Sequence, residues 1–121
     1  MLNCLIVGLG GFIGAVGRYL IGLIPLREDF VFPVKTLAVN LIGALLIGIL
    51  AAVAAKHPQT DPRLLLFLKV GICGGFTTFS TFALESVDLL KAEHPALAAL
   101  YIALSILFGI AAVFAGQAVV R

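Results

Sequence analysis

The polar side chains within the apolar stretches of this chain are mostly neutral hydrogen-bond donors. The Asn40 amide carries two donor hydrogens, which must find partners if the residue lies in lipid. Tyr101 and Ser105 are four residues apart, so they share one face of a helix. Each donor could bind a neighbouring helix, which is the usual role of one such group, but together they could line a track for a small anion. The donors are Thr36, Asn40, Ser80, Thr81, Tyr101 and Ser105.

Two phenylalanines, Phe79 and Phe82, accompany these donors at a spacing of three residues, which places them on one face of a helix. A Phe ring is most often a packing residue. Its edge, however, is the positive part of the aromatic quadrupole, so edge-on rings can stabilise an anion without holding it tightly. Weak affinity at several sites is what permeation requires.

Ionisable residues are rare in the apolar stretches and lie toward their ends, where solvent can relieve the charge. The middle of the membrane would contain no carboxylate, which argues against a carrier coupled to protons or cations. The chain has no Ser/His/Asp set or metal-ligand cluster, and His57 and His94 each precede a proline. The sequence therefore predicts that the protein is not an enzyme. The ionisable residues concerned are Arg18, Lys69, Glu85 and Asp88.

The elements that position these groups must be transmembrane helices. Of the 121 residues, 62% are hydrophobic, 8 are Lys or Arg and 6 are Asp or Glu. A span needs about 20 apolar residues, so the chain has room for four spans and little else. We expect one all-α transmembrane domain over residues 1–121, with spans near 2–24, 36–55, 64–90 and 95–120. The net charge of +2 is too small to indicate a nucleic-acid partner.

The third expected span contains the sequence GGFTTFST at residues 74–81, which is a poor match for an uninterrupted helix. Non-helical backbone at membrane depth persists only inside protein or beside a polar cavity. We therefore expect the third helix to be interrupted near residues 74–81. In the alternative, the glycines only permit close helix packing, while Ser and Thr bond back to the helix.

The basic residues give no preferred orientation. Four spans place both termini on one side of the membrane, and each side then carries three loop or terminal Lys and Arg residues. An excess of such residues on one side normally sets the topology, and here there is no excess. The balance predicts insertion in both orientations and pairing as an antiparallel homodimer, unless another feature selects a single orientation. The two groups are Lys56, Arg63 and Arg121 on one side, and Arg27, Lys35 and Lys91 on the other.

Three segments resemble the signature segments of the Fluc, or CrcB, family of fluoride channels: GGFIGAVGRY at residues 10–19, TLAVNLIGALLIG at 36–48 and GICGGFTTFSTF at 71–82. They occur in the family's order and spacing across nearly the whole chain. The resemblance implies an antiparallel dual-topology dimer in the inner or plasma membrane of a prokaryote. It implies two pores, each lined by both protomers, that export fluoride passively, exclude chloride and relieve fluoride toxicity.

The resemblance also implies residue roles. Phe79 and Phe82 would present their ring edges to fluoride, and the backbone carbonyls of Gly74 and Thr77, from both protomers, would hold a structural sodium ion. Ala83 stands where many members have serine, which puts a donor at that position in doubt. The remaining pathway residues would be Arg18, Asn40, Ser80, Thr81, Glu85, Tyr101 and Ser105.

Two other functions fit parts of the pattern. A small dual-topology multidrug exporter has the same size and charge balance, but it binds organic cations through a glutamate in its first span. Residues 2–24 contain no acidic residue. A structural or assembly subunit would use the polar set only for contacts between helices.

Overall fold

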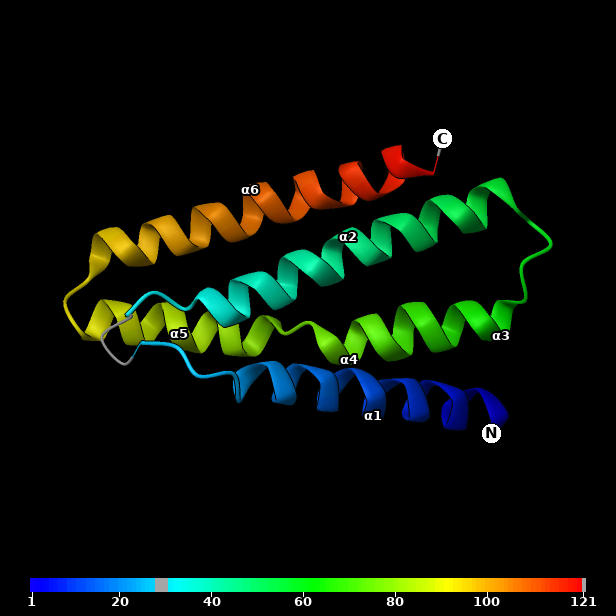
Figure 1. Cartoon of the computed structure of the whole chain (residues 1–121), viewed down its shortest axis with the longest axis horizontal. Coiled ribbons are helices and arrows are strands. Elements are labelled where there is room, and N and C mark those ends of the chain that lie inside the picture. Colours follow the sequence, from blue (N-terminus) through cyan, green and yellow to red (C-terminus); the bar gives the residue numbers. More distant parts are fainter. Residues whose placement is uncertain (28–30, 121) are drawn as a thin grey trace.

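The computed structural model describes residues 1–27 and 31–120, and within these ranges it contains helices and no strand. Four helical segments are long and apolar enough to cross a membrane, which confirms the all-α four-span prediction. Figure 1 shows an antiparallel bundle with both termini at the same end. The spans are α1 (Leu2–Gly22), α2 (Val34–Lys56), the composite span Pro62–Lys91 and α6 (Pro95–Val119).

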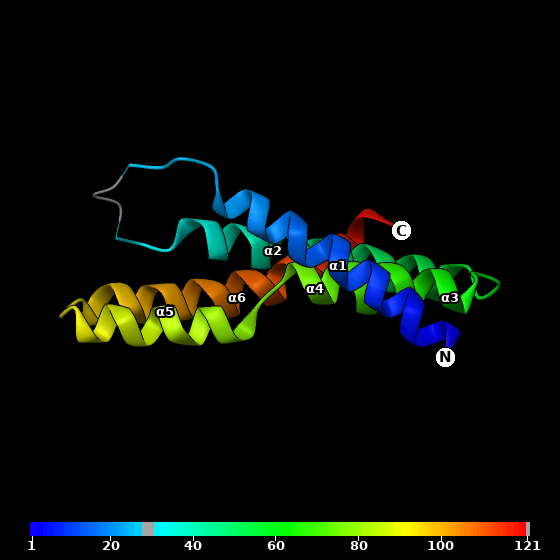
Figure 2. The ribbon, with the colours of Figure 1, turned by 90° about the horizontal axis from the view of Figure 1, so that it is seen from below.

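The third span is built from several pieces. Helix α3 (Pro62–Leu65), the π-helix η1 (Leu66–Cys73) and α4 (Gly74–Phe76) follow one another directly. Helix α5 (Phe79–Lys91) begins only after Thr77 and Thr78, whose backbones are extended. Figure 2 shows that this link carries the chain sideways from α4 to α5. The non-helical part is narrower than the expected range of 74–81, because residues 74–76 and 79–81 are helical.

Glycines place the first half of this span directly against α1. A Cβ atom added to Gly10 would lie 2.8 Å from the Cα atom of Gly71, and one added to Gly75 would lie 2.9 Å from the Cα atom of Gly11. Such distances mean that backbone touches backbone, as in the small-residue packing of membrane helices. The contacts fix α4, and therefore the start of the extended link at Thr77.

The turn between α5 and α6 satisfies the last carbonyls of α5. Glu93 has a φ of 63°, its N–H donates to the Leu90 carbonyl, and the His94 N–H donates to the Leu89 carbonyl. This is a Schellman arrangement, in which a left-handed residue closes the helix. Pro95 then opens α6, where a proline is well placed because its missing N–H is not needed.

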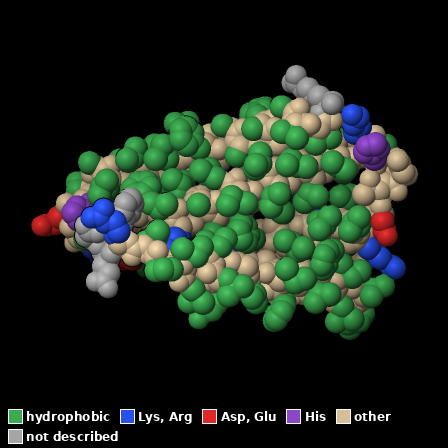
Figure 3. Space-filling model, in the orientation of Figure 1, with side chains coloured by type: hydrophobic (Ala, Val, Ile, Leu, Met, Phe, Trp, Pro, Cys, Tyr) green, Lys and Arg blue, Asp and Glu red, His purple; other side chains and the backbone are tan. Residues whose placement is uncertain are grey.

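Charged side chains gather toward the two ends of the bundle, and apolar side chains cover the region between them on the face in Figure 3. Large apolar side chains such as Leu5, Phe12, Leu107 and Phe114 are exposed along α1 and α6. This distribution is that of a multi-pass membrane protein, in which lipid or another protein covers the apolar belt. Arg121, which enters the charge comparison above, lies outside the described residues.

Candidate ion pathway

Asn40 on α2 binds both backbone groups of Thr78 in the extended link. The Thr78 N–H donates to Asn40 Oδ1 at 2.8 Å, and Asn40 Nδ2 donates to the Thr78 carbonyl at 3.0 Å. The two extended residues interrupt the helical hydrogen-bond ladder, and unpaired backbone groups are costly in a membrane. The Asn40 side chain therefore replaces the missing helical partners and stabilises the link. One amide hydrogen of Asn40 remains beyond these two bonds.

A cavity of about 380 Å³ lies beside this link. Among the described residues that line it, none is Asp, Glu, Lys or Arg, so its polar groups are amide, hydroxyl, thiol and backbone groups. The cavity brings together residues from α2, the third span and α6 that are far apart in the sequence. Its lining includes Asn40, Gly74, Thr77, Thr78, Phe79, Phe82 and Ser105.

The hydroxyl oxygen of Ser105 is buried and has no hydrogen-bond partner within the described part of the chain. Buried hydroxyls are nearly always paired, because leaving one without a partner costs about 1–3 kcal/mol. Ser105 lines the same cavity as Phe79 and Phe82. Ser105 therefore has a hydroxyl donor that no described group of the chain uses.

The two phenylalanines that line the cavity, Phe79 and Phe82, belong to a longer series of aromatic contacts. The ring centroids of Phe79 and Phe82 are 5.8 Å apart, and those of Phe82 and Tyr101 are 5.1 Å apart with ring planes at 62°. The rings of Phe32 and Tyr101 also meet edge-on, with their centroids 5.6 Å apart. The Phe79 ring is 79% exposed in the single chain. Exposed phenylalanines also occur elsewhere on the bundle, such as Phe12 and Phe114, but these do not line the inner cavity.

Glu85 accepts hydrogen bonds from two hydroxyl groups. Tyr101 donates to Glu85 Oε1 at 2.9 Å, and Thr36 donates to Glu85 Oε2 at 3.0 Å. Tyr101 is fully buried and lines none of the described cavities. Because a hydroxyl has one hydrogen, the Tyr101 hydroxyl has none left for an anion while this bond exists. The structure thus gives Tyr101 a positioning contact with Glu85.

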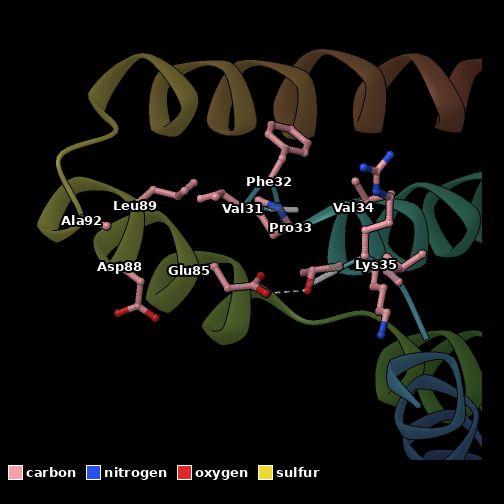
Figure 4. A pocket seen from close by; sticks show the side chains of 12 residues that line it. Val31, Phe32, Pro33, Val34, Lys35, Glu85, Asp88, Leu89 and Ala92 are labelled. Atoms are coloured by element: carbon pink, nitrogen blue, oxygen red, sulfur yellow. Dashed lines mark hydrogen bonds between the residues drawn. The ribbon is translucent and has the colours of Figure 1, made fainter. Parts of the chain in front are cut away.

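Two outer cavities lie at the end of the bundle away from the termini. One, of about 530 Å³, is lined by Lys35, Thr36, Glu85 and Asp88, and Figure 4 shows the bond between Thr36 and Glu85 as a dashed line. The other, of about 310 Å³, is lined by Arg18, Lys35, Thr36, Thr78 and Thr81. Thr78 also lines the 380 Å³ cavity, so the second outer cavity and the inner cavity share one wall.

The expected pathway residues thus divide into groups. Asn40, Phe79, Phe82 and Ser105 meet at the inner cavity, whereas Arg18 and Thr81 line the 310 Å³ outer cavity. Arg18 Nε also lies 3.4 Å from the Gly75 carbonyl. Ser80 is exposed and lines none of the cavities described above.

The sequence analysis did not identify Thr78, Phe32 or Lys35 as parts of the site. Thr78 stands beside Thr77 in the segment expected to be interrupted, so an extended backbone there could have drawn attention to its N–H and carbonyl groups. Phe32 lies in a loop, and no motif or spacing in the sequence indicated that it belongs to the site. Lys35 entered only as a charge in the topology comparison.

The carbonyls of Gly74 and Thr77 have lost the donors that a continuous α-helix would give them. In such a helix the Thr78 N–H would bind the Gly74 carbonyl, but it binds Asn40 instead. The Thr81 N–H would bind the Thr77 carbonyl, but it donates to Thr78 Oγ1 at 3.2 Å. Unwound carbonyls of this kind coordinate sodium in membrane proteins, so the donor set fits a sodium ion.

The model of the family described as CrcB-like protein, Camphor Resistance (CrcB), matches residues 5–117. The chain belongs to this family. The match confirms the resemblance seen in the three sequence segments, and it includes most of each of the four spans of the CrcB bundle.

Curated relatives of this CrcB-family chain match it over almost their full length. A protein named fluoride-specific ion channel FluC from Agrobacterium fabrum is 45% identical over 122 aligned positions, covering 100% of this chain and 98% of the relative. A protein of the same name from Chlorobaculum tepidum is 43% identical, covering 96% of this chain and 92% of the relative. These names describe ion channels rather than enzymes, in agreement with the prediction from the sequence.

Proposed function

We propose that this chain forms a fluoride-selective channel that lets fluoride leave the cytoplasm passively and so relieves fluoride toxicity. The observation that carries the proposal is the inner cavity, which is lined by neutral polar residues, two phenylalanines and Ser105, whose hydroxyl is unpaired within the described chain. Membership of the CrcB family and the names of the relatives support fluoride as the ion. They also favour a channel over the multidrug exporter considered above.

The lining chemistry suits fluoride. Fluoride is a compact acceptor that is strongly hydrated, so its entry into a low-dielectric pore requires donors along the way. The inner cavity is lined by Ser105, Asn40, Phe79 and Phe82, whose hydroxyl, remaining amide hydrogen and ring edges would supply these donors. A fixed cation there would hold the ion too strongly for conduction. With the cell interior negative, an outgoing anion gains about 2.3 kcal/mol per 100 mV, so no coupled energy source is needed.

The channel is proposed to be an antiparallel homodimer with two pores, each lined by both protomers. The equal division of basic residues supports insertion in both orientations. The exposed Phe79 ring supports a second copy, because a pore wall that is 79% exposed cannot enclose an ion on its own. Four helices are also too few to surround a pathway completely.

A structural sodium ion is proposed at the centre of this dimer, held by the Gly74 and Thr77 carbonyls of both protomers. The support is that both carbonyls are released from helical pairing at the same link. A bound cation would supply fixed positive charge that holds the two links together. Gly74 is exposed in the single chain, which leaves its carbonyl accessible to a second copy.

The decisive experiment is anion efflux from liposomes that contain the purified protein. At equal membrane potential, we expect fast efflux of fluoride and no protein-dependent efflux of chloride. Equal efflux of both ions would contradict selectivity. Absence of both from a verified dimer would contradict the channel function and favour organic-cation transport or a structural role.

The same liposomes test the assembly. If the protein inserts in both orientations, a tag on the C-terminus is expected to be accessible from both sides of the membrane. Replacement of sodium by a large organic cation is expected to reduce fluoride efflux if sodium holds the dimer. Tags on one side only would contradict dual topology, and unchanged efflux after thorough sodium removal would contradict the sodium site.

A further inference from the structure

The 310 Å³ outer cavity has the composition of an anion-binding site. Its lining contains two cations, Arg18 and Lys35, and the hydroxyls of Thr78 and Thr81; Thr36 also lines it, but its hydroxyl donates to Glu85. None of the described residues that line it is Asp or Glu. The sign of the fixed charge in this cavity is therefore positive, whereas the inner cavity carries no fixed charge.

Lys35 is held in a defined position at this cavity. Its Nζ donates to the carbonyl of Gly22, the last residue of α1, at 2.8 Å. A cation at a helix C-terminus is stabilised by the helix dipole, so this bond anchors the ammonium group. Figure 4 shows the Lys35 side chain extending toward α1 and away from Glu85 and Asp88.

The ammonium group keeps capacity to attract an anion. An ammonium has three donor hydrogens, and the bond to Gly22 uses one of them. Lys35 makes no ion pair with any acidic residue in the ranges 1–27 and 31–120. Its charge is therefore not neutralised by a carboxylate of the described chain.

The cavity leads toward the proposed pore. Lys35 is the second residue of α2, at the loop end of the bundle, whereas Thr78 lies at the link in the middle of the third span. Both line the same cavity, and Thr78 also lines the inner cavity. An anion that enters beside Lys35 thus approaches the wall that separates it from Phe79 and Phe82.

We infer that Lys35 is an electrostatic capture residue that concentrates fluoride at the mouth of the pathway. This inference rests on the proposed fluoride conduction and adds to it a residue that sets how fast the ion enters. Lys35 does not coordinate the ion inside the pore. The attraction between the Lys35 ammonium group and fluoride acts through solvent, so salt must weaken it. A contact inside the pore is screened much less.

Lys35 lies between two outer cavities, and the charges of their linings decide which of them an anion enters. Arg27 and Lys35 both line the 530 Å³ cavity, but Glu85 and Asp88 line it as well, and these two carboxylates offset the positive charge there. The cavity on the Arg18 side has no such opposition among its described lining. The pair Arg18 and Lys35 therefore directs anions to the side that shares Thr78 with the inner cavity.

The test is single-channel fluoride conductance in planar bilayers of neutral lipid, with Lys35→Gln compared with the unmodified protein. Fluoride stays constant while an impermeant salt raises the ionic strength from about 10 mM to about 1 M, which shortens the Debye length from about 30 Å to about 3 Å. One charge about 7 Å from the ion in water changes its local concentration about threefold. We expect Lys35→Gln to conduct about threefold less at low ionic strength and equally at high ionic strength.

Two further variants separate charge from structure. Lys35→Arg keeps the charge and a donor for Gly22, so it is expected to conduct like the unmodified protein. Lys91→Gln removes a charge at the same end of the bundle, but Lys91 lies outside the lining of both outer cavities, so conductance is expected to remain unchanged.

Three results would overturn the inference. A Lys35→Gln deficit that is the same at both ionic strengths would make Lys35 a structural residue that caps α1. Equal conductance of Lys35→Gln and the unmodified protein at low ionic strength would remove Lys35 from ion capture. Absence of fluoride current through the unmodified protein would instead refute the proposed function, and the role of Lys35 with it.

Discussion

Replacement of Phe82 or Phe79 by isoleucine is expected to lower fluoride flux about tenfold or more while the protein remains folded. Isoleucine keeps an apolar side chain in the cavity wall but removes the positive ring edge. The loss of an edge interaction of about 1.4 kcal/mol at the barrier corresponds to a tenfold change in rate. The measurement is initial fluoride efflux from liposomes at matched protein content.

The matched control for these variants is Phe114→Ile. Phe114 is 68% exposed on α6 and lines none of the described cavities, so its replacement is expected to leave the flux unchanged. Size-exclusion profiles of the variants establish that each is folded and assembled. Normal flux through both Phe79→Ile and Phe82→Ile would show that the rings serve only for packing.

Replacement of Asn40 by leucine is expected to abolish fluoride flux and to destabilise the protein. The Thr78 N–H and carbonyl would both lose their side-chain partner within the third span. Each buried backbone group left unpaired costs about 1–3 kcal/mol, which gives about 2–6 kcal/mol for the pair. The measurement is the thermal midpoint in detergent together with fluoride efflux.

Ser86→Ala provides the control for Asn40→Leu. The Ser86 hydroxyl donates to the Phe82 carbonyl within α5, so its removal deletes a buried polar group without disturbing the link. Stability and flux are expected to change little. If Asn40→Leu retained both the thermal midpoint and the flux of the unmodified protein, the bond to Thr78 would not be required for the link or the pathway.

The sequence predicts the four spans well because their signal is local. Runs of about 20 apolar residues, each closed by charges or proline, define α1, α2, the third span and α6 without knowledge of their packing. The ends differ by a few residues from the expected 2–24, 36–55, 64–90 and 95–120. Val34 and Lys35, for example, join α2 because Pro33 permits a helix to begin directly after it.

The site is predicted less completely because its geometry depends on contacts between spans. Asn40 was expected to be a donor in or beside the pore, but both of its bonds in the structure are to Thr78, which lies 38 residues away. Similarly, the Tyr101 hydroxyl is directed at Glu85, a contact that no local pattern encodes. The grouping of Phe79, Phe82 and Ser105, in contrast, follows the residues that the sequence singled out.

The bond between Asn40 and Thr78 also has a consequence for biosynthesis. Without Asn40, the Thr78 N–H and carbonyl in the extended link would lie in the membrane without their partner, which is costly. Because chains are made from the N-terminus, α2 leaves the ribosome before the third span and is already available as a partner. The partner that stabilises the extended link is therefore already synthesised when the third span is made.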